Sequence, residues 1–252
     1  MVSALIVIPA RLKSTRLPGK SLMRQTGKYL IEHVYEQAAK SQRAVGIVVA
    51  TDDQQIVEAV RGFDGQVVLT SPDHRSGTDR IAQVAAMPQY SSFSSIVNVQ
   101  GDEPEIDPAL IDDLIRLLEA TDVQMVTAAA PFENREEIFN PNVVKVVVDQ
   151  RRFALYFSRS VIPHDRDSIT LNAGRLELAV LYRKHLGVYA YRRNFLLTLT
   201  QTPQCEIEKL EQLEQLRALY LGAKILVHDA PMAHHGIDTP EDYAAFVKRM
   251  SS

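Results

Sequence analysis

An apolar run followed at once by a basic loop is the feature that most constrains the fold of this chain. Residues 3–8, SALIVI, have the pattern of a short strand buried on both faces of a parallel sheet. Residues 9–20 then carry four cations and two prolines, which restrict the backbone. Ligands of open α/β sheets bind at the carboxyl ends of strands, and such a loop suits a polyphosphate. The pattern predicts a phosphate site, with an ordinary solvated basic loop as the alternative.

The end of this loop resembles a P-loop only in part. Gly19, Lys20 and Ser21 match the last three positions of the pattern G-x-x-x-x-G-K-[ST], but Ser14 stands where the first glycine is required. The P-loop interpretation therefore fails, and a different phosphate-binding loop remains the hypothesis.

The first half of the chain alternates between strand and helix patterns. Strand patterns cover residues 3–8, 45–50, 66–70 and 95–100. Helix patterns begin near residues 27, 53, 76 and 107. This alternation predicts a three-layer α/β nucleotide-binding fold.

A capping-box spacing marks one of these helix starts. Ser76 and Asp79 predict a helix that begins at residue 76, with Arg80 one turn further on. The free N–H groups of such a helix start could hold a base or a phosphate beside the first loop. A capped helix without a ligand is the alternative.

Two aspartates are candidate metal ligands. Asp102 follows the strand pattern at 95–100, so we expect it at the same sheet edge as the basic loop. Mg²⁺ takes one or two carboxylates and fills its other positions with phosphate oxygens and water. Asp238 is the candidate second ligand. The alternative for Asp102 is an ordinary turn residue, and the alternative for Asp238 is an ordinary residue before a helix. His234 and His235 indicate a transition metal only weakly, because no third spaced ligand accompanies them.

The second half of the chain has a different pattern. Strands are predicted at 123–129, 143–148, 153–157, 185–191 and 224–228, and a single amphipathic helix at 206–221. We expect residues 1–252 to form one domain, in which about 123–205 is a smaller lobe.

Two patterns in this half bear on function. In the strand at 185–191, His185, Gly187, Tyr189 and Tyr191 share one face, which suits a hydroxylated ligand or a subunit interface. In the helix at 206–221 one side is expected to hold Leu210, Leu213, Leu216, Arg217 and Tyr220. Its glutamates are expected on a solvated face: Glu208, Glu211 and Glu214.

Composition limits the possible partners and the compartment. The net charge of −3 indicates no general attraction to nucleic acid or to an anionic membrane. No stretch approaches the roughly 20 apolar residues of a membrane span. Cys205 is the single cysteine, so an internal disulfide is excluded and a reducing compartment, the cytoplasm, is expected.

A series of motifs along almost the whole chain resembles the 3-deoxy-manno-octulosonate (Kdo) cytidylyltransferases. The matching stretches are IPARLKSTRLPGK (8–20), VATDD (49–53), DHRSGTDR (73–80), VNVQGDEP (97–104), FNPNVVKVV (139–147), ALYFSRSVIP (154–163), HLGVYAYR (185–192), LEQLR (213–217) and GIDTPED (236–242). The resemblance implies a nucleotide-diphospho-sugar transferase-like fold. It implies transfer of CMP from CTP to the anomeric hydroxyl of Kdo, with Mg²⁺ and release of pyrophosphate. It further implies a cytoplasmic homodimer whose product is used in lipopolysaccharide biosynthesis.

The resemblance also implies roles for particular residues. The expected nucleotide-binding residues are Ala10, Arg11, Ser14, Arg16, Lys20, Ser76 and Arg80. Lys20, Arg11 and Asp102 are expected to be catalytic, with Asp102 and Asp238 as the Mg²⁺ ligands. The expected sugar-acid residues are Gln100, Arg159, His185, Tyr189 and Glu211. The lobe at about 123–205 is expected to serve sugar binding or dimerisation.

The chain departs from the family pattern in two places. His234 and His235 replace a small, glycine-rich stretch, and residues 167–183 match poorly. A CMP-sugar synthetase for sialic acid or for an 8-amino analogue of Kdo is therefore an alternative enzyme. A non-catalytic nucleotide-binding protein is the alternative from another class, but Lys20 and Asp102, which such a protein would be expected to lose, are both present.

Overall fold

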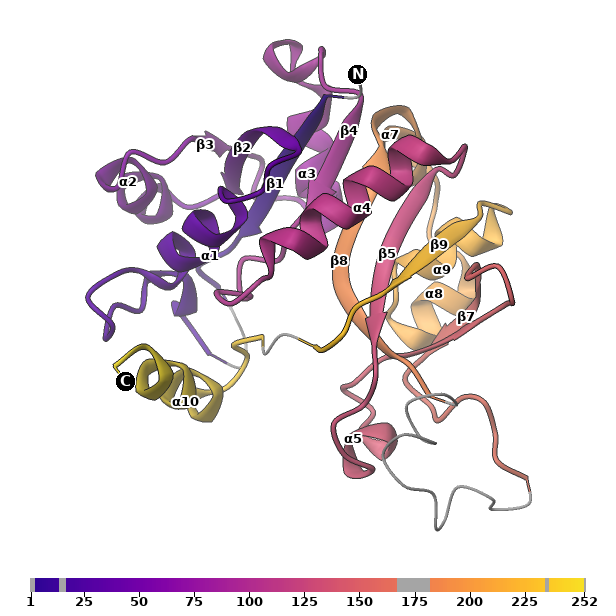
Figure 1. The fold of residues 1–252 in the computed structure, drawn as a ribbon. Coiled ribbons are helices and arrows are strands. Elements are labelled where there is room, and N and C mark those ends of the chain that lie inside the picture. The colour runs from indigo at the N-terminus through magenta and orange to yellow at the C-terminus, as the bar shows by residue number, and fades with distance from the viewer. Residues whose placement is uncertain (1–2, 14–16, 167–181, 234–235, 252) are drawn as a thin grey trace.

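A nine-stranded mixed sheet forms the centre of the computed structural model, which describes residues 3–13, 17–166, 182–233 and 236–251 (Figure 1). Strand β1 (Ala4–Ala10) is almost wholly buried and pairs in parallel with β2 (Ala44–Thr51) and β4 (Ser95–Asn98). The first strand of the chain thus lies inside the sheet, as its continuous apolar run predicts. The basic loop that follows it leaves the sheet between two neighbouring strand ends.

The sheet changes direction halfway across. Its strand order is β3-β2-β1-β4-β8-β5-β9, and β8 runs antiparallel to both β4 and β5. The remaining strands of this path are β3 (Val67–Leu69), β8 (Lys184–Arg192), β5 (Met125–Ala130) and β9 (Ile225–Asp229). The predicted strands are therefore confirmed, with shifts of a few residues at their ends.

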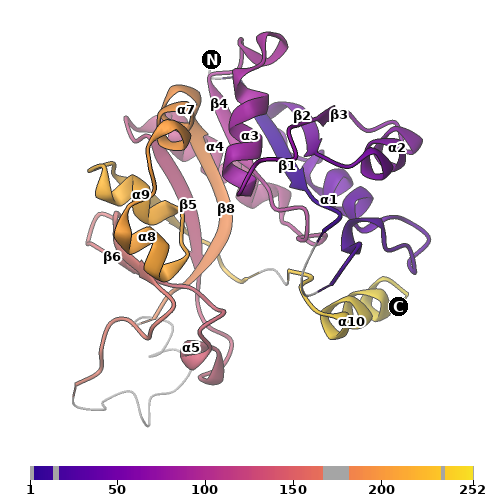
Figure 2. The same cartoon turned by 180° about the vertical axis from the view of Figure 1, so that it is seen from behind.

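Helices cover both faces of the sheet. On one face α1 (Leu30–Ala38), α2 (Gln54–Gly62) and α4 (Pro108–Ala120) cover the sheet, in a core that includes Ile6 and Ile8 of β1 (Figure 1). On the other face, four helices cover the sheet, in a core that includes Leu5 and Val7 of β1 (Figure 2). These are α3 (Gly77–Ala86), α7 (Arg193–Gln201), α8 (Glu206–Glu211) and α9 (Gln215–Tyr220). The predicted three-layer α/β fold is confirmed.

Polar caps begin several helices where the sequence predicts them. Asp53, Ser76 and Asp107 accept backbone hydrogen bonds at the starts of α2, α3 and α4. Thr239 and Asp242 form a capping box at the start of α10 (Pro240–Met250), which packs beside α1 (Figure 1). The short helices are η1 (Lys20–Leu22), η2 (Pro88–Tyr90) and α5 (Glu136–Phe139). No helix among the described residues is long and apolar enough to cross a membrane.

The prediction of a single helix at 206–221 is wrong, because two short helices, α8 and α9, occupy this segment. The chain breaks between α8 and α9 at Gln212, which has a left-handed backbone (φ 53°). Leu210 is 83% exposed, although the pattern placed it on the apolar side. The physical reason is a buried ion pair: Arg217 donates from Nε and Nη2 to the two oxygens of Glu208 at 2.8 and 2.7 Å. The chain folds back to form this pair, so the Glu208 side chain is buried and does not face solvent as the helix pattern predicts.

A hairpin projects from the far end of the sheet. Strands β6 (Lys145–Val148) and β7 (Ala154–Ser158) pair with each other, and β6 also contacts β8. Helix α5 lies near them below the main sheet (Figures 1 and 2). The predicted lobe at 123–205 also contains β5, β8 and α7, which belong to the sheet and its helical layer.

Candidate active site

A cleft of about 360 Å³ lies where the carboxyl ends of β1 and β4 meet. Three loops and the segment before α10 form its walls. Its lining residues are Pro9, Ala10, Arg11, Lys13, Lys20, Ser21, Arg75, Ser76, Gly77, Gln100, Gly101, Asp102 and Asp238. Segments separated by more than 200 positions in the sequence thus meet in one cleft, and most of the predicted nucleotide and metal residues lie in its wall. Ser14 and Arg16 lie outside the described residues.

The Lys20 cluster consists of Lys20, Asp102 and Asp238. The Lys20 ammonium donates to Asp102 Oδ2 at 2.7 Å and to Asp238 Oδ1 at 3.0 Å. It also donates to the Ile237 carbonyl at 2.9 Å. Burial by itself would lower the pKa of Lys20, but the two carboxylates outweigh it and raise that pKa. Lys20 is therefore a fixed positive charge in the floor of the cleft.

Gly19 and Gly101 allow this cluster to form. Gly19 has a left-handed backbone (φ 72°) directly before η1, which starts at Lys20. At Gly101 a Cβ atom would come within 2.6 Å of the Pro9 carbonyl oxygen, so only glycine lets the loops after β1 and β4 approach so closely.

The carboxylates of Asp102 and Asp238 suit a divalent cation that is shared with a phosphate. Both contact one cation already, the Lys20 ammonium, so their oxygens converge on a single point. Among the described residues, no group of three or more His, Cys, Asp or Glu side chains is placed so that it could hold a metal ion. Two carboxylates with substrate oxygens form the kind of site that Mg²⁺ uses. The histidine hypothesis concerns residues 234–235, which lie outside the described part of the chain.

Glu103 is a neighbour of this cluster that the sequence analysis did not single out. Burial raises its pKa to about 8, and the charges of Asp102 and Asp238 add to the shift. Its place in the Gly-Asp-Glu-Pro turn, directly after Asp102, is the only signal that could have drawn attention to it.

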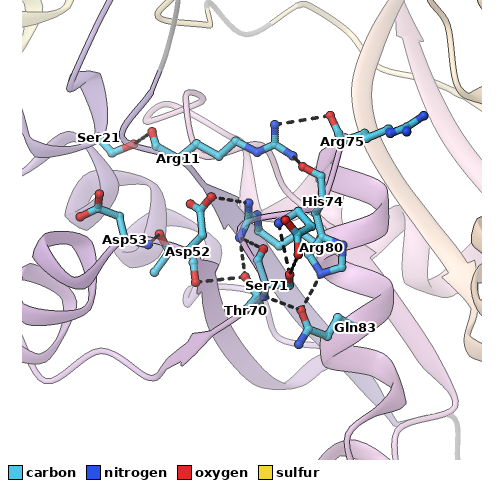
Figure 3. Close-up of polar contacts among 12 residues, drawn as sticks. Arg11, Ser21, Asp52, Asp53, Thr70, Ser71, His74, Arg75, Arg80 and Gln83 are labelled. Carbon is cyan, nitrogen blue, oxygen red and sulfur yellow. Dashed lines mark hydrogen bonds and ion pairs between the residues drawn. The ribbon is translucent and has the colours of Figure 1, made fainter.

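Arg11 ties the first loop to the loop that precedes α3 (Figure 3). Its guanidinium donates to the His74 carbonyl at 2.6 Å and to the Arg75 carbonyl at 3.4 Å. Ser76, which lines the cleft at the start of α3, accepts from the Asp79 backbone N–H at 3.1 Å. The predicted nucleotide residues Arg11 and Ser76 therefore lie on adjoining loops of one cleft.

Arg80 lies beneath the cleft rather than in its wall. Its side chain is completely buried, pairs with Asp52 at 3.1 Å and donates to Thr70 and to the Ser71 carbonyl (Figure 3). Burial lowers the pKa of Arg80 although Asp52 opposes that shift. The structure thus gives Arg80 a contact that joins the ends of β2 and β3 to α3, and its predicted nucleotide contact stays a prediction.

A second cavity of about 560 Å³ adjoins the first cleft. It is lined by Thr78, Asn98, Gln100, Arg159, Gly187, Tyr189, Tyr191, Leu199, Gln212, Leu213, Glu214 and Gln215. Gln100 lines both spaces and donates from Nε2 to the Gly187 carbonyl at 3.1 Å. Among the predicted sugar residues, Gln100, Arg159 and Tyr189 therefore share this cavity.

His185 and Glu211 lie outside the lining of the second cavity. The His185 ring packs 4.9 Å from the Phe157 ring and 5.4 Å from the Tyr189 ring, so the predicted shared face of β8 is present. Burial lowers the pKa of His185 to about 3, which leaves the imidazole neutral. Glu211 accepts from Ser158 Oγ at 2.6 Å and from the Arg159 backbone N–H at 2.9 Å. Its carboxylate is half-buried in this contact, not on the solvated face that the helix pattern predicts.

Three residues of the second cavity carry buried polar atoms without a hydrogen-bonding partner in the described part of the chain. These atoms are Asn98 Oδ1, Glu214 Oε2 and Gln215 Nε2. The helix pattern predicts a solvated face for Glu214, which is wrong, and Asn98 and Gln215 were not among the predicted site residues. Asn98 could have been found from Gln100, because residues two apart in a strand share a face. Leaving buried polar atoms unpaired is costly, so this wall suits a ligand that has hydroxyl groups.

Sequence comparison identifies the class of protein to which this fold and cleft belong. A sequence model of the family described as Cytidylyltransferase matches residues 5–225. A 3-deoxy-manno-octulosonate cytidylyltransferase of Pseudomonas fluorescens is 50% identical over 94% of each chain. One of Vibrio vulnificus is 45% identical over 96% of this chain and 95% of its own. The chain belongs to the 3-deoxy-manno-octulosonate cytidylyltransferase family.

Solved structures agree with this assignment. A CMP:2-keto-3-deoxy-manno-octonic acid synthetase in complex with CTP has a TM-score of 0.89 at 38% identity, covering 99% of this chain and 98% of its own. A cytidylyltransferase of Leptospira borgpetersenii has a TM-score of 0.63 at 18% identity, covering 100% and 87%. These neighbours confirm the predicted nucleotide-diphospho-sugar transferase-like fold.

Proposed function

We propose that this protein transfers CMP from CTP to the anomeric hydroxyl of Kdo and releases pyrophosphate. The observation that carries the proposal is the meeting of two polar cavities at Gln100, one containing the Lys20 cluster and the other containing Arg159. A nucleotide and a sugar acid bound in them would have their reacting atoms next to each other. The names of the relatives and the CTP bound to the similar synthetase support this pair of substrates.

In the first cleft, Arg11, Lys13, Lys20 and Arg75 provide the positive charge for a triphosphate. The acceptor hydroxyl attacks the α-phosphorus in line and loses its proton to solvent. A new P–O bond forms, and the bond to the leaving pyrophosphate breaks, its electron pair going to the pyrophosphate oxygen. Catalysis then consists mainly of positioning and of neutralising charge on the phosphates. Lys20 stabilises the negative charge that shifts onto the leaving group.

Asp102 and Asp238 would hold Mg²⁺, which when bound neutralises phosphate charge as a Lewis acid. The convergence of both carboxylates on one cation supports this role. Ala10 and Ser76, which also line the cleft, would contact the rest of the nucleotide.

In the second cavity, Arg159 would bind the carboxylate of Kdo and Tyr189 would bind a hydroxyl. The buried, unpaired atoms of Asn98 and Gln215 support a hydroxylated ligand there. His185 packs behind Tyr189, and Glu211 holds the backbone of Arg159, so both would shape this cavity.

The proposal extends to assembly and location. The family resemblance supports a homodimer in the cytoplasm whose product enters lipopolysaccharide biosynthesis. Size measurement in solution and fractionation of cells would test these two points separately from the chemistry.

The test is pyrophosphate release from CTP with equal concentrations of Kdo, 8-amino-Kdo and sialic acid. We expect pyrophosphate release from CTP to be fastest with Kdo and slow with sialic acid. The reason is that a site of buried polar groups rejects acceptors that leave those groups unpaired. Preference for 8-amino-Kdo would overturn the acceptor and keep the reaction. Preference for sialic acid would overturn the interpretation of the second cavity, and no release with any acceptor would overturn the enzymatic function.

A further inference from the structure

Lys145, at the start of β6, is a completely buried lysine that binds only carbonyl oxygens among the described residues. Its Nζ donates to Asn140 O at 3.0 Å, to Val143 O at 2.8 Å and to Arg159 O at 2.6 Å. Three donors therefore meet three acceptors, which is the full capacity of an ammonium group. A lysine buried in this way connects two segments, the turn at 140–143 and the end of β7.

Arg159 fastens the same turn from the other side. Its Nη1 donates to the Pro141 carbonyl at 3.2 Å, and its Nε donates to the Glu211 carbonyl at 2.8 Å. The turn at 140–143 is thus held between the Lys145 ammonium and the Arg159 guanidinium. Lys145 also binds the Arg159 carbonyl. It therefore fixes the backbone from which the Arg159 side chain extends and the turn to which the Arg159 guanidinium donates.

The charges of this group are unevenly balanced. Neither Lys145 nor Arg159 forms an ion pair with a carboxylate within the described ranges. The acidic residue that contacts Arg159 is Glu211, whose carboxylate accepts from the Arg159 backbone N–H and whose carbonyl accepts from Arg159 Nε. Burial lowers the pKa of Lys145, the charge of Arg159 adds to that shift, and Glu211 opposes it. We name Lys145, Arg159 and Glu211 the Arg159 cluster; its two cations and one carboxylate leave an excess of positive charge beside the second cavity.

We propose that Lys145 is a positioning residue for the acceptor: it holds Arg159 in the wall of the second cavity and so sets the affinity for the acceptor's carboxylate. This inference rests on the proposed function, in which Arg159 binds that carboxylate. Lys145 itself does not line the cavity and does not touch the reacting atoms. Its effect is therefore confined to the acceptor and leaves the nucleotide cleft unchanged.

The first experiment compares Lys145→Met with Lys184→Met. Lys184 is the matched control because it lies directly opposite Lys145 across the β6–β8 pair, yet it binds the Glu137 carboxylate at 3.0 Å. For Lys145→Met we expect a rise of about tenfold or more in KM for Kdo, with KM for CTP unchanged within twofold. Lys184→Met should leave both values unchanged. An equal rise in both KM values, or no rise, in Lys145→Met would overturn the proposal.

A double-mutant cycle with Arg159→Ala distinguishes positioning from general damage. If Lys145 acts through Arg159, Lys145→Met should have little further effect on KM for Kdo in the Arg159→Ala background. Effects that multiply in the double variant would overturn the proposal. If Arg159→Ala alone leaves KM for Kdo unchanged, the proposed function of Arg159 fails and the inference falls with it, which is a separate outcome.

Removing the ammonium exposes three buried carbonyls to an apolar side chain, so folding must be checked. CTP binding by calorimetry and the circular dichroism spectrum report on the fold independently of the acceptor. If Lys145→Met does not fold, the same cycle is run with Lys145→Gln, whose amide keeps two donors but no charge. We expect Lys145→Gln to raise KM for Kdo less than Lys145→Met, again only when Arg159 is present. Independence from Arg159 in this variant would equally overturn the proposal.

Discussion

The Lys20 cluster and the Arg159 cluster hold their cations in opposite ways. Lys20 lies between the carboxylates of Asp102 and Asp238, so one cation faces two negative groups. In the Arg159 cluster two cations face one carboxylate, and their contacts are with backbone carbonyls. The first arrangement attracts a further cation together with the phosphates it carries, and the second attracts an anion. The net charge of the groups around a buried cation therefore indicates whether the adjoining cavity is suited to a cation or to an anion.

The largest expected effect is at the acidic side of this comparison. Asp102→Asn removes one of the two carboxylates, so we expect kcat to fall on the order of 10³-fold, with the melting temperature little changed because the residue lies in a loop. Initial rates with saturating CTP and Kdo measure the loss. Excess EDTA should abolish activity in the unaltered protein. Full activity in the variant, or in EDTA, would contradict the proposed metal site.

Lys20→Ala tests the cation of the same cluster. If its charge acts in the transition state, kcat should fall on the order of 10²-fold. Lys20→Arg should restore part of the rate, because a planar guanidinium does not reproduce a compact ammonium. A change in KM for CTP with kcat intact would show that Lys20 only binds substrate.

Arg159→Ala sharpens the comparison from the other side. Loss of a charge-assisted hydrogen bond of roughly 1.5–3 kcal/mol predicts a rise in KM for Kdo of about tenfold to 100-fold. The kcat value and KM for CTP should stay within a few-fold, since the nucleotide lies in the other cleft. Steady-state kinetics with each substrate varied in turn provides both numbers. A loss confined to kcat would contradict the division of tasks between the clusters.

The smallest expected effect is a pH dependence of stability that arises from His185. Its pKa is 6.5 in the unfolded chain and about 3 in the folded protein, so below pH 6.5 protons bind preferentially to the unfolded state. This contribution to stability is complete above pH 6.5 and declines as the pH falls toward 3, by at most about 1.4 kcal/mol per pH unit. Urea unfolding at pH 7 and pH 5 should therefore show a smaller loss for His185→Phe than for the unaltered protein. Equal losses would mean that His185 titrates normally in the fold.

The parts of the molecule that are determined locally could be predicted from the sequence. The apolar run of β1 and the cap at Ser76 form where the pattern indicates, because each depends on neighbouring residues. The convergence of Lys20 and Asp102 followed from the rule that parallel strands end at the same edge of a sheet.

Features that depend on distant pairings could not be predicted in this way. Glu208 lies in an ordinary amphipathic pattern, and Lys145 interrupts a run of valines. Only their contacts, with Arg217 and with three carbonyls, show why these charged residues are buried. The break at Gln212 has the same origin, since the Glu208–Arg217 pair folds α9 back on α8. The motifs predict that Arg80 and Glu211 bind ligands. Their contacts with Asp52 and with Ser158 join segments far apart in the sequence, so the motifs could not indicate them.

The claim that the Arg159 cluster binds the acceptor carboxylate is tested by removing the charge of the acceptor and the charge of Arg159, separately and together. The carboxamide of Kdo keeps every hydroxyl but has no negative charge, so it should be a poorer acceptor than Kdo by about 10²-fold in kcat/KM with the unaltered protein. With Arg159→Ala this difference should shrink to nearly nothing, because the cation that distinguishes the two acceptors is gone. The same discrimination in both proteins would show that the carboxylate binds elsewhere and would contradict the account.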